Sequence, residues 1–531
     1  MSARASVSKK AKVKPTIPAK SRGESRTLSP LKLGAARLTL EQIREVAVGG
    51  RQVELSPKAV ALIQRAHRFL QAEVAKGKIL YGVNTGFGLM SNVQIAPSQI
   101  ETLQVNLIRS HAVGVGDYLR DDHVRAMLLL RAANLAIGNS GVSLGLVQQI
   151  LKLLNAGIHP LIPEQGSVGA SGDLAPLSHL ALVLIGEGRA RINGREMDGA
   201  RALATQGIKP IRLGPKEGLA LINGTQFMTA IGALTLLDAE HLCDAADASG
   251  AMTCEALRGT SSAFEPEIHS VRPHPGQVLV AARMRKLLHS GGKSEISRSH
   301  ENCGKVQDAY SLRCIPQVHG ASRDALRFVR DSLEREVNSV TDNPLVFPES
   351  GKILSGGNFH GQIIAIAMDV LCIAVAELAS IAEQRIQKLI NPALSDLPAF
   401  LVKEGGLNSG FMIVQVAAAS IVSENKTLCH PASVDSIPTS ADKEDHVSMG
   451  AWAARKAARV MENSRRVLAM ELLCGAQGID LLRPLRASRA VEGIHAIIRK
   501  KARRLDADRS LHEDILYVER LLKQHDFKDW L

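Results

Sequence analysis

The chain of 531 residues is far longer than one hydrophobic core usually supports, so we expect several domains or one elongated helical body. Hydrophobic residues make up 45% of the sequence and aromatic residues only 3%, so Ala, Leu, Ile and Val supply the core, which favours packed helices over a β-sandwich. The net charge of +13 lies mostly at the start of the chain. The seven cysteines never form a C-x-x-C pair and indicate neither a disulfide framework nor a zinc site.

Residues 1–30 form the most strongly basic segment. They contain eight Lys and Arg side chains against Glu24 alone, a net charge of +7, which leaves +6 for the rest of the chain. The segment has too few large apolar residues to bury a core, so we predict a disordered basic tail. A plain solvated extension is favoured over polyanion binding or organelle targeting, and we expect no nucleic-acid partner.

Glycines and capping residues divide the next part of the chain, residues 31–218, into helices and loops. Ser56 followed by Pro57 is typical of a helix start. Asp121 and Ser143 are expected to cap two further helices. The predicted helices span 57–77, 121–138 and 143–157, and glycine-rich loops span 81–88 and 160–176.

From residue 219 onward, long Ala- and Leu-rich segments with helical periodicity predict one bundle. The segments are 219–250, 318–339, 360–390, 410–428 and 448–475. The most apolar stretch, 363–376, is short and interrupted by Asp369, so we expect a buried helix and no membrane span. No apolar leader precedes these segments, and the free cysteines favour the cytoplasm.

The predicted fold class is therefore mainly α. We expect an amino-terminal domain over 31–218 that holds the glycine-rich loops. A long helical bundle with carboxy-terminal helices is expected over 219–531.

Two motifs suggest chemistry but have plainer explanations. Residues 141–145 match the G-x-S-x-G turn of serine hydrolases, but a helix is predicted where that turn needs a strand, so Ser143 is better explained as a helix cap. The triplet Glu444-Asp445-His446 could form an acid–base cluster. Adjacent residues on a helix point in different directions, however, so surface polarity or support of another site is the better interpretation.

The loop 166–173, Gly-Ser-Val-Gly-Ala-Ser-Gly-Asp, contains a tripeptide that can cyclise. If the Gly172 nitrogen attacks the Ala170 carbonyl and Ser171 loses its hydroxyl group as water, the product is a five-membered ring with an exocyclic methylene. Glycine leaves the nitrogen unhindered, serine supplies the leaving group and alanine adds no bulk. Asp173 could assist proton movement. Ala-Ser-Gly alone is a common turn sequence, so the other motifs must decide.

The run Gly-Ser-Val-Gly-Ala-Ser-Gly-Asp-Leu-Ala-Pro-Leu at 166–177 resembles the signature of the aromatic amino-acid ammonia-lyases. The resemblance covers about residues 35–510. It includes Tyr-Gly-Val-Asn-Thr-Gly-Phe-Gly at 81–88, Asn-Gly-Thr at 223–225, Gln-Asp-Ala-Tyr-Ser-Leu-Arg at 307–313 and Gly-Asn-Phe-His at 357–360.

This resemblance implies a 4-methylidene-imidazol-5-one group that forms autocatalytically from Ala170, Ser171 and Gly172, with no external cofactor and no metal. It also implies a mainly helical homotetramer whose active sites are shared among subunits. Tyr81 is the expected general base, and Arg313 is expected to hold the substrate carboxylate through two parallel hydrogen bonds. The residues expected around the amine, the carboxylate and the ring are Asn223, Gln307, Tyr310 and Phe359.

Two segments resemble the histidine-specific members of this family, namely Ser110-His111 and the blocks between Ser423 and Met449. His111 and Glu424 are expected to bind the two ends of an imidazole, and Glu424 is counted among the catalytic residues. The implied reaction converts L-histidine to trans-urocanate and ammonia, the first step of histidine degradation.

Three alternatives stay open at this stage. A tyrosine ammonia-lyase or aminomutase would use the same ring, and some tyrosine aminomutases also carry Ser-His at this position. A basic helical nucleic-acid-binding protein is supported only by the charge. An inactive relative is disfavoured because Tyr81, Ser171, Arg313 and Glu424 are all present.

Overall fold

The structure, a computed structural model, describes residues 28–301, 303–304, 306–527 and 529. Helices account for 58% of the chain and strands for 8%, so the predicted mainly α fold class is confirmed. The predicted tail over residues 1–30 lies almost entirely outside the described residues. The division of the chain at residue 218 stays a prediction.

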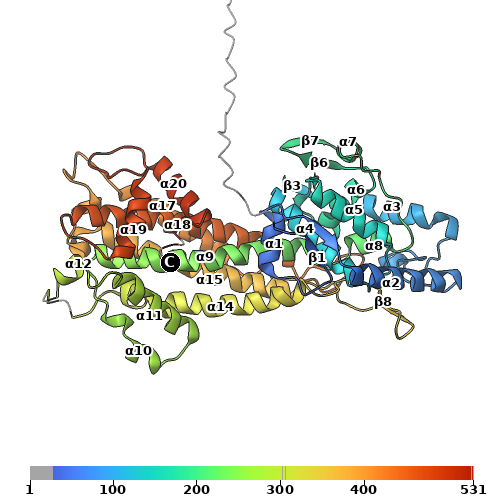
Figure 1. Cartoon of the computed structure of the whole chain (residues 1–531), viewed down its shortest axis with the longest axis horizontal. Coiled ribbons are helices and arrows are strands. Elements are labelled where there is room, and N and C mark those ends of the chain that lie inside the picture. Colours follow the sequence, from blue (N-terminus) through green and yellow to red (C-terminus); the bar gives the residue numbers. More distant parts are fainter. Residues whose placement is uncertain (1–27, 302, 305, 528, 530–531) are drawn as a thin grey trace, which may run out of the picture.

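Long helices run along the greatest dimension of the molecule and form the predicted bundle (Figure 1). The bundle helices are α9 (Gln226–Ala256), α14 (Ile315–Glu336), α15 (Gln362–Ile390), α17 (Met412–Leu428) and α18 (Gly450–Leu481). Helices α9, α15 and α18 begin next to the amino-terminal part and run away from it, whereas α14 ends there. Three positive helix ends therefore meet at one end of the bundle.

The amino-terminal part, on the right in Figure 1, consists of shorter helices and small sheets. The helices are α1 (Leu40–Ala47), α2 (Pro57–Ala75), α3 (Ile100–His111), α4 (Asp121–Ala136), α5 (Leu144–Asn155), α6 (Leu174–Leu184), α7 (Gly199–Thr205) and α8 (Glu217–Ile222). The strands are β1 (Leu31–Leu33), parallel to β2 (Val53–Leu55); β3 (Val115–Tyr118), antiparallel to β5 (Pro163–Gln165); and the antiparallel set β4 (His159–Pro160), β6 (Arg189–Ile192) and β7 (Arg195–Asp198).

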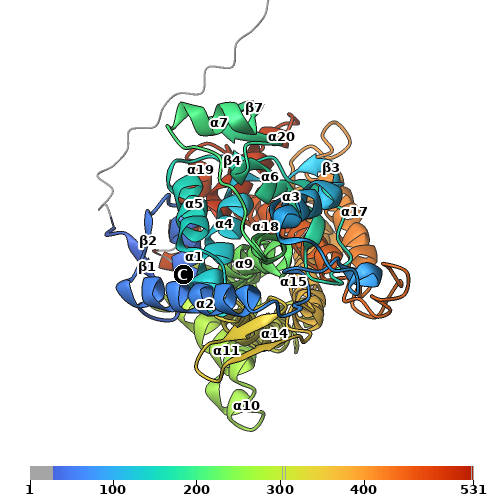
Figure 2. The same ribbon diagram turned by 90° about the vertical axis from the view of Figure 1, so that its right-hand side faces the viewer.

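The remaining helices flank the bundle (Figure 2). Helices α10 (Pro266–Ser270) and α11 (Pro275–Leu288) lie on one side of it, and α19 (Arg489–Arg499) and α20 (His512–Lys523) lie on the other in both views. Short elements complete the chain: α12 (Glu295–Arg298), α13 (Tyr310–Arg313), α16 (Pro392–Ser395), and the hairpin of β8 (Leu345–Phe347) and β9 (Lys352–Leu354).

Two of the three predicted helix caps are confirmed. The Ser56 hydroxyl accepts a hydrogen bond from the backbone nitrogen of the third helical residue in α2, and Ser143 does the same for α5. The cap predicted at Asp121 is wrong. Asp121 is the first residue of α4, and its carboxylate pairs with Arg191 at 2.8 Å instead of with the helix backbone.

Helix α15 contains the apolar stretch singled out in the sequence. Its length and apolarity alone would allow a membrane span, but 61% of its most apolar window is buried inside the protein, as is typical of a core helix. Ile363, Ile366 and Ile373 nevertheless remain 40–49% exposed, and Ile413 and Val416 of α17 are more than half exposed. The bundle therefore retains an apolar surface that another protein surface could cover.

Candidate active site

The loop 166–173 joins β5 to α6 and lies where the bundle helices begin. Its backbone is bound to the start of α18, since Met449 nitrogen donates to the Val168 carbonyl at 2.8 Å and the Ser448 hydroxyl donates to the Gly169 carbonyl at 3.1 Å. These bonds attach the loop that contains the predicted reactive tripeptide to the start of a long bundle helix.

Gly172 packs backbone to backbone against Gly224, at the start of α9. The Asp173 nitrogen donates to the Gly224 carbonyl at 2.7 Å, and Gly172 has a φ of 76°. A Cβ atom at residue 172 would lie 2.2 Å from the Gly224 oxygen, so only glycine fits. The residue before Gly224 contributes as well, because the Asn223 side-chain nitrogen donates to the Ser171 carbonyl at 3.2 Å. The segment 223–225 therefore holds the tripeptide in a bent conformation.

Asp173 connects the loop to the amino terminus of α9. Its carboxylate is fully buried and accepts hydrogen bonds from the backbone nitrogens of Phe227 at 2.9 Å and Met228 at 3.1 Å. Burial raises the pKa of Asp173 to about 7, although the two backbone donors oppose the shift. Asp173 can therefore gain or lose a proton near neutral pH, beside the residues that are predicted to cyclise.

The Ser171 side chain lies in a cavity of about 510 Å³. The structure brings six of the predicted site residues to its wall: Tyr81, His111, Ala170, Ser171, Asn223 and Phe359. Gly172 follows directly in the chain. Leu107, Leu174, Leu219 and Ile222 supply an apolar part of the wall. The cavity thus combines polar groups with apolar surface, as ligand sites usually do.

Tyr81 lies in the glycine-rich turn that follows α2. Its ring meets Phe87 edge-on, with the ring centroids 6.5 Å apart, and its phenol oxygen accepts a hydrogen bond from the Gly88 nitrogen at 3.4 Å. A donor at this oxygen stabilises negative charge there.

His111 is the last residue of α3. Its Nδ1 lies 2.8 Å from the Leu107 carbonyl oxygen and 3.0 Å from the Ser110 hydroxyl. Because a carbonyl oxygen only accepts hydrogen bonds, Nδ1 carries the proton in the neutral ring, and Nε2 is an acceptor. His111 can therefore receive a hydrogen bond from an N–H group in the cavity.

Glu444 binds Ser171 directly, so of the two interpretations of Glu444-Asp445-His446, support of another site describes Glu444 and surface polarity does not. Glu444 Oε1 accepts a hydrogen bond from the Ser171 hydroxyl at 2.8 Å, and Oε2 accepts bonds from the Thr439 and Ser440 hydroxyls at 2.7 and 2.8 Å. The segment between α17 and α18 is irregular rather than helical, so all three residues of the triplet can line the same cavity. Their place in a block that resembles the histidine-specific enzymes was the available signal.

Glu424, in contrast, lies outside this cavity. It is on α17, its side chain is 45% exposed, and Arg459 of α18 donates to it at 3.1 Å, which holds the pKa of Glu424 below its ordinary value. Arg459 lies nine residues beyond the start of α18, about 13 Å along the helix from the end that binds the loop. Within one chain, Glu424 does not reach Ser171.

Gln307, Tyr310 and Arg313 lie at the opposite end of the bundle, in and just before α13. Tyr310 is 71% exposed, and the Arg313 guanidinium lies over its ring at 4.5 Å. Arg385 of α15 contacts the carbonyl of Ser311 in the same turn at 3.5 Å. Because Arg385 is about six turns from the start of α15, these residues are about 35 Å from the loop. One chain alone therefore cannot bring Arg313 to Ser171.

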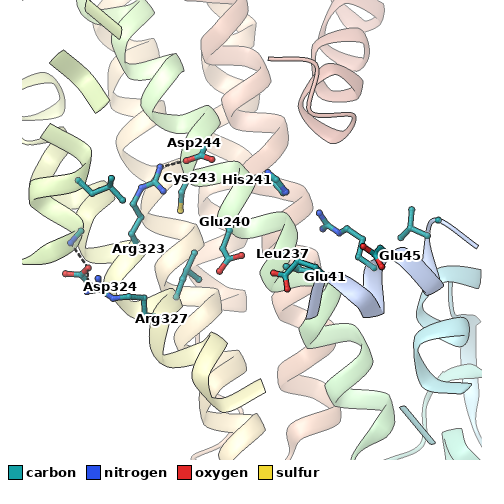
Figure 3. Close-up of a pocket in the computed structure, with 16 residues that line it drawn as sticks. Glu41, Glu45, Leu237, Glu240, His241, Cys243, Asp244, Arg323, Asp324 and Arg327 are labelled. Atoms are coloured by element: carbon teal, nitrogen blue, oxygen red, sulfur yellow. Dashed lines mark hydrogen bonds and ion pairs between the residues drawn. The ribbon is translucent and has the colours of Figure 1, made fainter. Parts of the chain in front are cut away.

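Figure 3 shows a second cavity, of about 790 Å³, between α1, α9 and α14. Some of its charged residues pair with one another, as Arg323 does with Asp244 at 2.8 Å and Arg327 with Asp324 at 2.5 Å, and others pair with residues outside the cavity. None of the predicted site residues lines it. Within the part of the chain that the structure describes, no group of three or more His, Cys, Asp or Glu side chains could hold a metal ion.

Comparisons with known proteins identify the family. Residues 38–500 match the model of the aromatic amino acid lyase family, and the chain belongs to this family. The membership expected from the sequence is confirmed. A histidine ammonia-lyase from Anaeromyxobacter sp. (strain K) is 52% identical over 94% of this chain and 99% of its own length. A histidine ammonia-lyase from Bos taurus is 51% identical over 91% of this chain and 74% of its own length.

Solved structures with the same fold include several activities. The histidine ammonia-lyase from Trypanosoma cruzi is 48% identical, covers 94% of each chain and has a TM-score of 0.88. The tyrosine aminomutase from Streptomyces globisporus is 40% identical, covers 94% of this chain and 98% of its own, and has a TM-score of 0.89. The fold is therefore common to lyases and aminomutases, and the substrate must be argued from the cavity.

Replacement of Asp173 by Asn should change how stability depends on pH. The unfolded carboxyl ionises near pH 4 and the folded one near pH 7, so within this window the folded chain binds more protons and stability falls as the pH rises. The loss reaches about 4 kcal/mol above pH 7. Asn does not titrate, so urea unfolding between about pH 4 and pH 8 should show a shallower decline for Asp173→Asn. If the stability of the wild type and of Asp173→Asn depended equally on pH, the raised pKa of Asp173 would be contradicted.

Proposed function

We propose that this protein eliminates ammonia from L-histidine to give trans-urocanate, and that its electrophile is a 4-methylidene-imidazol-5-one group formed from Ala170, Ser171 and Gly172. The observation that carries the proposal is the contact of Gly172 with Gly224, which bends this tripeptide at the wall of a polar cavity. The histidine ammonia-lyases at about 50% identity support the choice of reaction and substrate.

The residues around the tripeptide fit the proposed group. Ring closure needs an unhindered nitrogen at residue 172. Glycine provides it, and the close approach of the Gly224 backbone leaves no room for a side chain at residue 172. Ring formation also needs the Ser171 hydroxyl to leave, and Glu444 is hydrogen-bonded to that hydroxyl. Asp173, directly after the tripeptide, can exchange a proton near neutral pH. No external cofactor is required by this chemistry.

When formed, the group supplies an electrophilic methylidene carbon that captures the substrate amine and makes it a better leaving group. The chain then has to stabilise negative charge at the ring oxygen, and the Asn223 side-chain nitrogen already donates to the Ser171 carbonyl that becomes this oxygen. Tyr81, at the same cavity, is the proposed base for the β-proton, and the Gly88 nitrogen stabilises charge on its oxygen. Phe359 is proposed to pack beside the ring.

Histidine is the substrate that this cavity suits best. His111 offers an acceptor nitrogen and Glu444 offers a carboxylate, so a protonated imidazole, which has an N–H at each ring nitrogen, can be bound at both ends, while Leu107 and Leu174 pack on its faces. A side chain that leaves these buried polar groups unpaired is penalised. We therefore propose Glu444, rather than Glu424, as the carboxylate partner of the substrate ring. A tyrosine-specific enzyme is the second candidate, supported by the fold shared with tyrosine aminomutases.

The proposed site is completed by other copies of the chain. Arg313 is proposed to bind the substrate carboxylate, with Gln307 and Tyr310 beside it, yet all three lie about 35 Å from Ser171 in the same chain. The exposed apolar residues of α15 and α17 would be covered in such an assembly. We propose a homotetramer with shared sites, acting in the cytoplasm with no nucleic-acid or membrane partner.

The purified protein should have a mass lower than that of the encoded chain by two waters, and the loss should map to the peptide that contains residues 170–172.

The purified protein should convert histidine, and not tyrosine, in an ultraviolet assay of the unsaturated product. Ser171→Ala cannot form the methylidene group and should lose at least about 10³-fold in activity. Tyrosine turnover without histidine turnover would overturn the choice of substrate.

Glu444→Gln should lower kcat/KM for histidine by at least about 100-fold, because the carboxylate that binds the substrate ring is removed. Glu424→Gln, on the neighbouring helix, should lower it by less than about tenfold. Steady-state kinetics on both variants, each with its degree of cyclisation checked by mass, distinguishes the two carboxylates. A larger loss for Glu424→Gln would restore the assignment made from the sequence.

Shared sites predict complementation between two inactive variants. Ser171→Ala destroys the electrophile and Arg313→Ala destroys the carboxylate site, so each variant alone should be inactive. When equal amounts of both chains assemble at random into tetramers, about a quarter of the sites combine an intact loop with an intact arginine. Co-expression followed by assay of mixed tetramers should recover activity in that proportion. No recovery in verified mixed tetramers would contradict sharing.

A further inference from the structure

A buried polar cluster contacts the segment 223–225 from α4 and from the residues that follow α14. Its charged members are Arg131, Lys216 and Asp342, and each is at most 1% exposed. Lys216 and Asp342 form an ion pair at 2.5 Å, which leaves the charge of Arg131 without a carboxylate among its hydrogen-bond partners in the described residues. Burial lowers the pKa of Arg131 to about 10, so its side chain stays charged at neutral pH.

The Arg131 guanidinium donates hydrogen bonds to two uncharged oxygen atoms. Its Nη1 donates to the Asn223 carbonyl at 2.7 Å, and its Nη2 donates to the Asn134 side-chain oxygen. Asn134 is itself fixed, because its nitrogen donates to the Ser339 carbonyl at 2.9 Å. A planar guanidinium that binds two fixed acceptors leaves the Asn223 backbone little freedom to move.

Asn223 transmits this restraint to the reactive tripeptide. Its side chain donates to the Ser171 carbonyl, and the carbonyl of the next residue, Gly224, accepts the Asp173 nitrogen. Arg131 therefore lies one residue away from the contact that bends the tripeptide. Asp342 attracts the Arg131 charge, but no carboxylate of a described residue is hydrogen-bonded to the guanidinium, so its burial is costly and an apolar side chain would suit simple packing better. This cost indicates a role in placing Asn223.

We propose that Arg131 is a positioning residue for ring closure: it fixes the segment 223–225 so that Gly224 and Asn223 hold residues 171–173 in the bent form. This inference rests on the proposed function, because it assumes that the tripeptide cyclises.

In the step that Arg131 assists, the Gly172 nitrogen forms a bond to the Ala170 carbonyl carbon. The Ala170 oxygen leaves as water with the amide protons of Gly172 and Ser171, and a carbon–nitrogen double bond forms to the Ser171 nitrogen. The Ser171 hydroxyl leaves as a second water with the α-proton of the same residue, which forms the methylidene. No oxidant or reductant is needed.

The test follows cyclisation by intact mass in the full-length protein, without an activity readout. Arg131→Met removes both hydrogen bonds and should leave at least tenfold fewer chains that have lost two waters. Arg131→Lys keeps the charge and can bind one of the two oxygens. When the chains are newly made by cell-free synthesis and their mass is followed with time, Arg131→Lys should lose water more slowly than the wild type and faster than Arg131→Met.

Arg125 on the same helix provides the matched control. It also donates to backbone carbonyls, those of Val46 and Leu154, but it does not contact the segment 223–225. Arg125→Met should lower the melting temperature and still cyclise fully. If Arg131→Met does not fold, the rate of water loss is compared between Arg131→Lys and Arg125→Met, provided that their melting temperatures are similar. Slower water loss in Arg131→Lys then supports the positioning role.

Full cyclisation of the Arg131 variants at the wild-type rate would overturn the inference and leave the proposed function intact. A wild-type chain that keeps both waters would instead refute the proposed function itself. Slower cyclisation in Arg125→Met than in Arg131→Lys would show that general destabilisation, rather than placement of Asn223, controls the reaction.

Discussion

Gly172 and Gly224 touch backbone to backbone, and the candidate active site depends on this contact. The two residues belong to segments about 50 positions apart. A side chain at residue 172 would meet the Gly224 backbone, and one at residue 224 would meet Gln226 and Thr341, so neither glycine could be replaced without moving a neighbour. The approach brings Asn223 to the Ser171 carbonyl and Asp173 to the amino terminus of α9. Ala-Ser-Gly at residues 170–172 is a common turn sequence. It becomes a candidate for cyclisation because a second tight turn, residues 223–225, packs against it.

The bundle binds the loop that makes this contact, and its length also explains why one chain is insufficient for the proposed site. Helices α9, α15 and α18 all begin near the loop, so their positive ends converge there, and Ser448 and Met449 bind the loop directly. Helix α13 lies at the far end of these helices, next to Arg385 of α15. The length of the bundle thus separates Ser171 from Arg313, and an assembly of several bundles is the simplest way to bring them together.

The sequence predicted much of the fold because its signals are local. Periodicity located the long helices, and Ser56 and Ser143 start helices as their side chains allow. The cap predicted at Asp121 was wrong because its carboxylate pairs with Arg191, a partner that no local sequence pattern specifies. Glu444 was missed for a similar reason: its loop has no regular period, and only tertiary structure brings it to Ser171.

The central claim is that residues 170–172 form a ring, and a high-resolution crystal structure of the purified enzyme tests it most directly. If the ring is present, electron density should be continuous between the Gly172 nitrogen and the Ala170 carbonyl carbon, the Ser171 α-carbon should be planar, and its hydroxyl oxygen should have no density. Density for an open chain with an intact serine hydroxyl, in crystals of protein that deaminates histidine at full rate, would show that no ring is needed for the reaction.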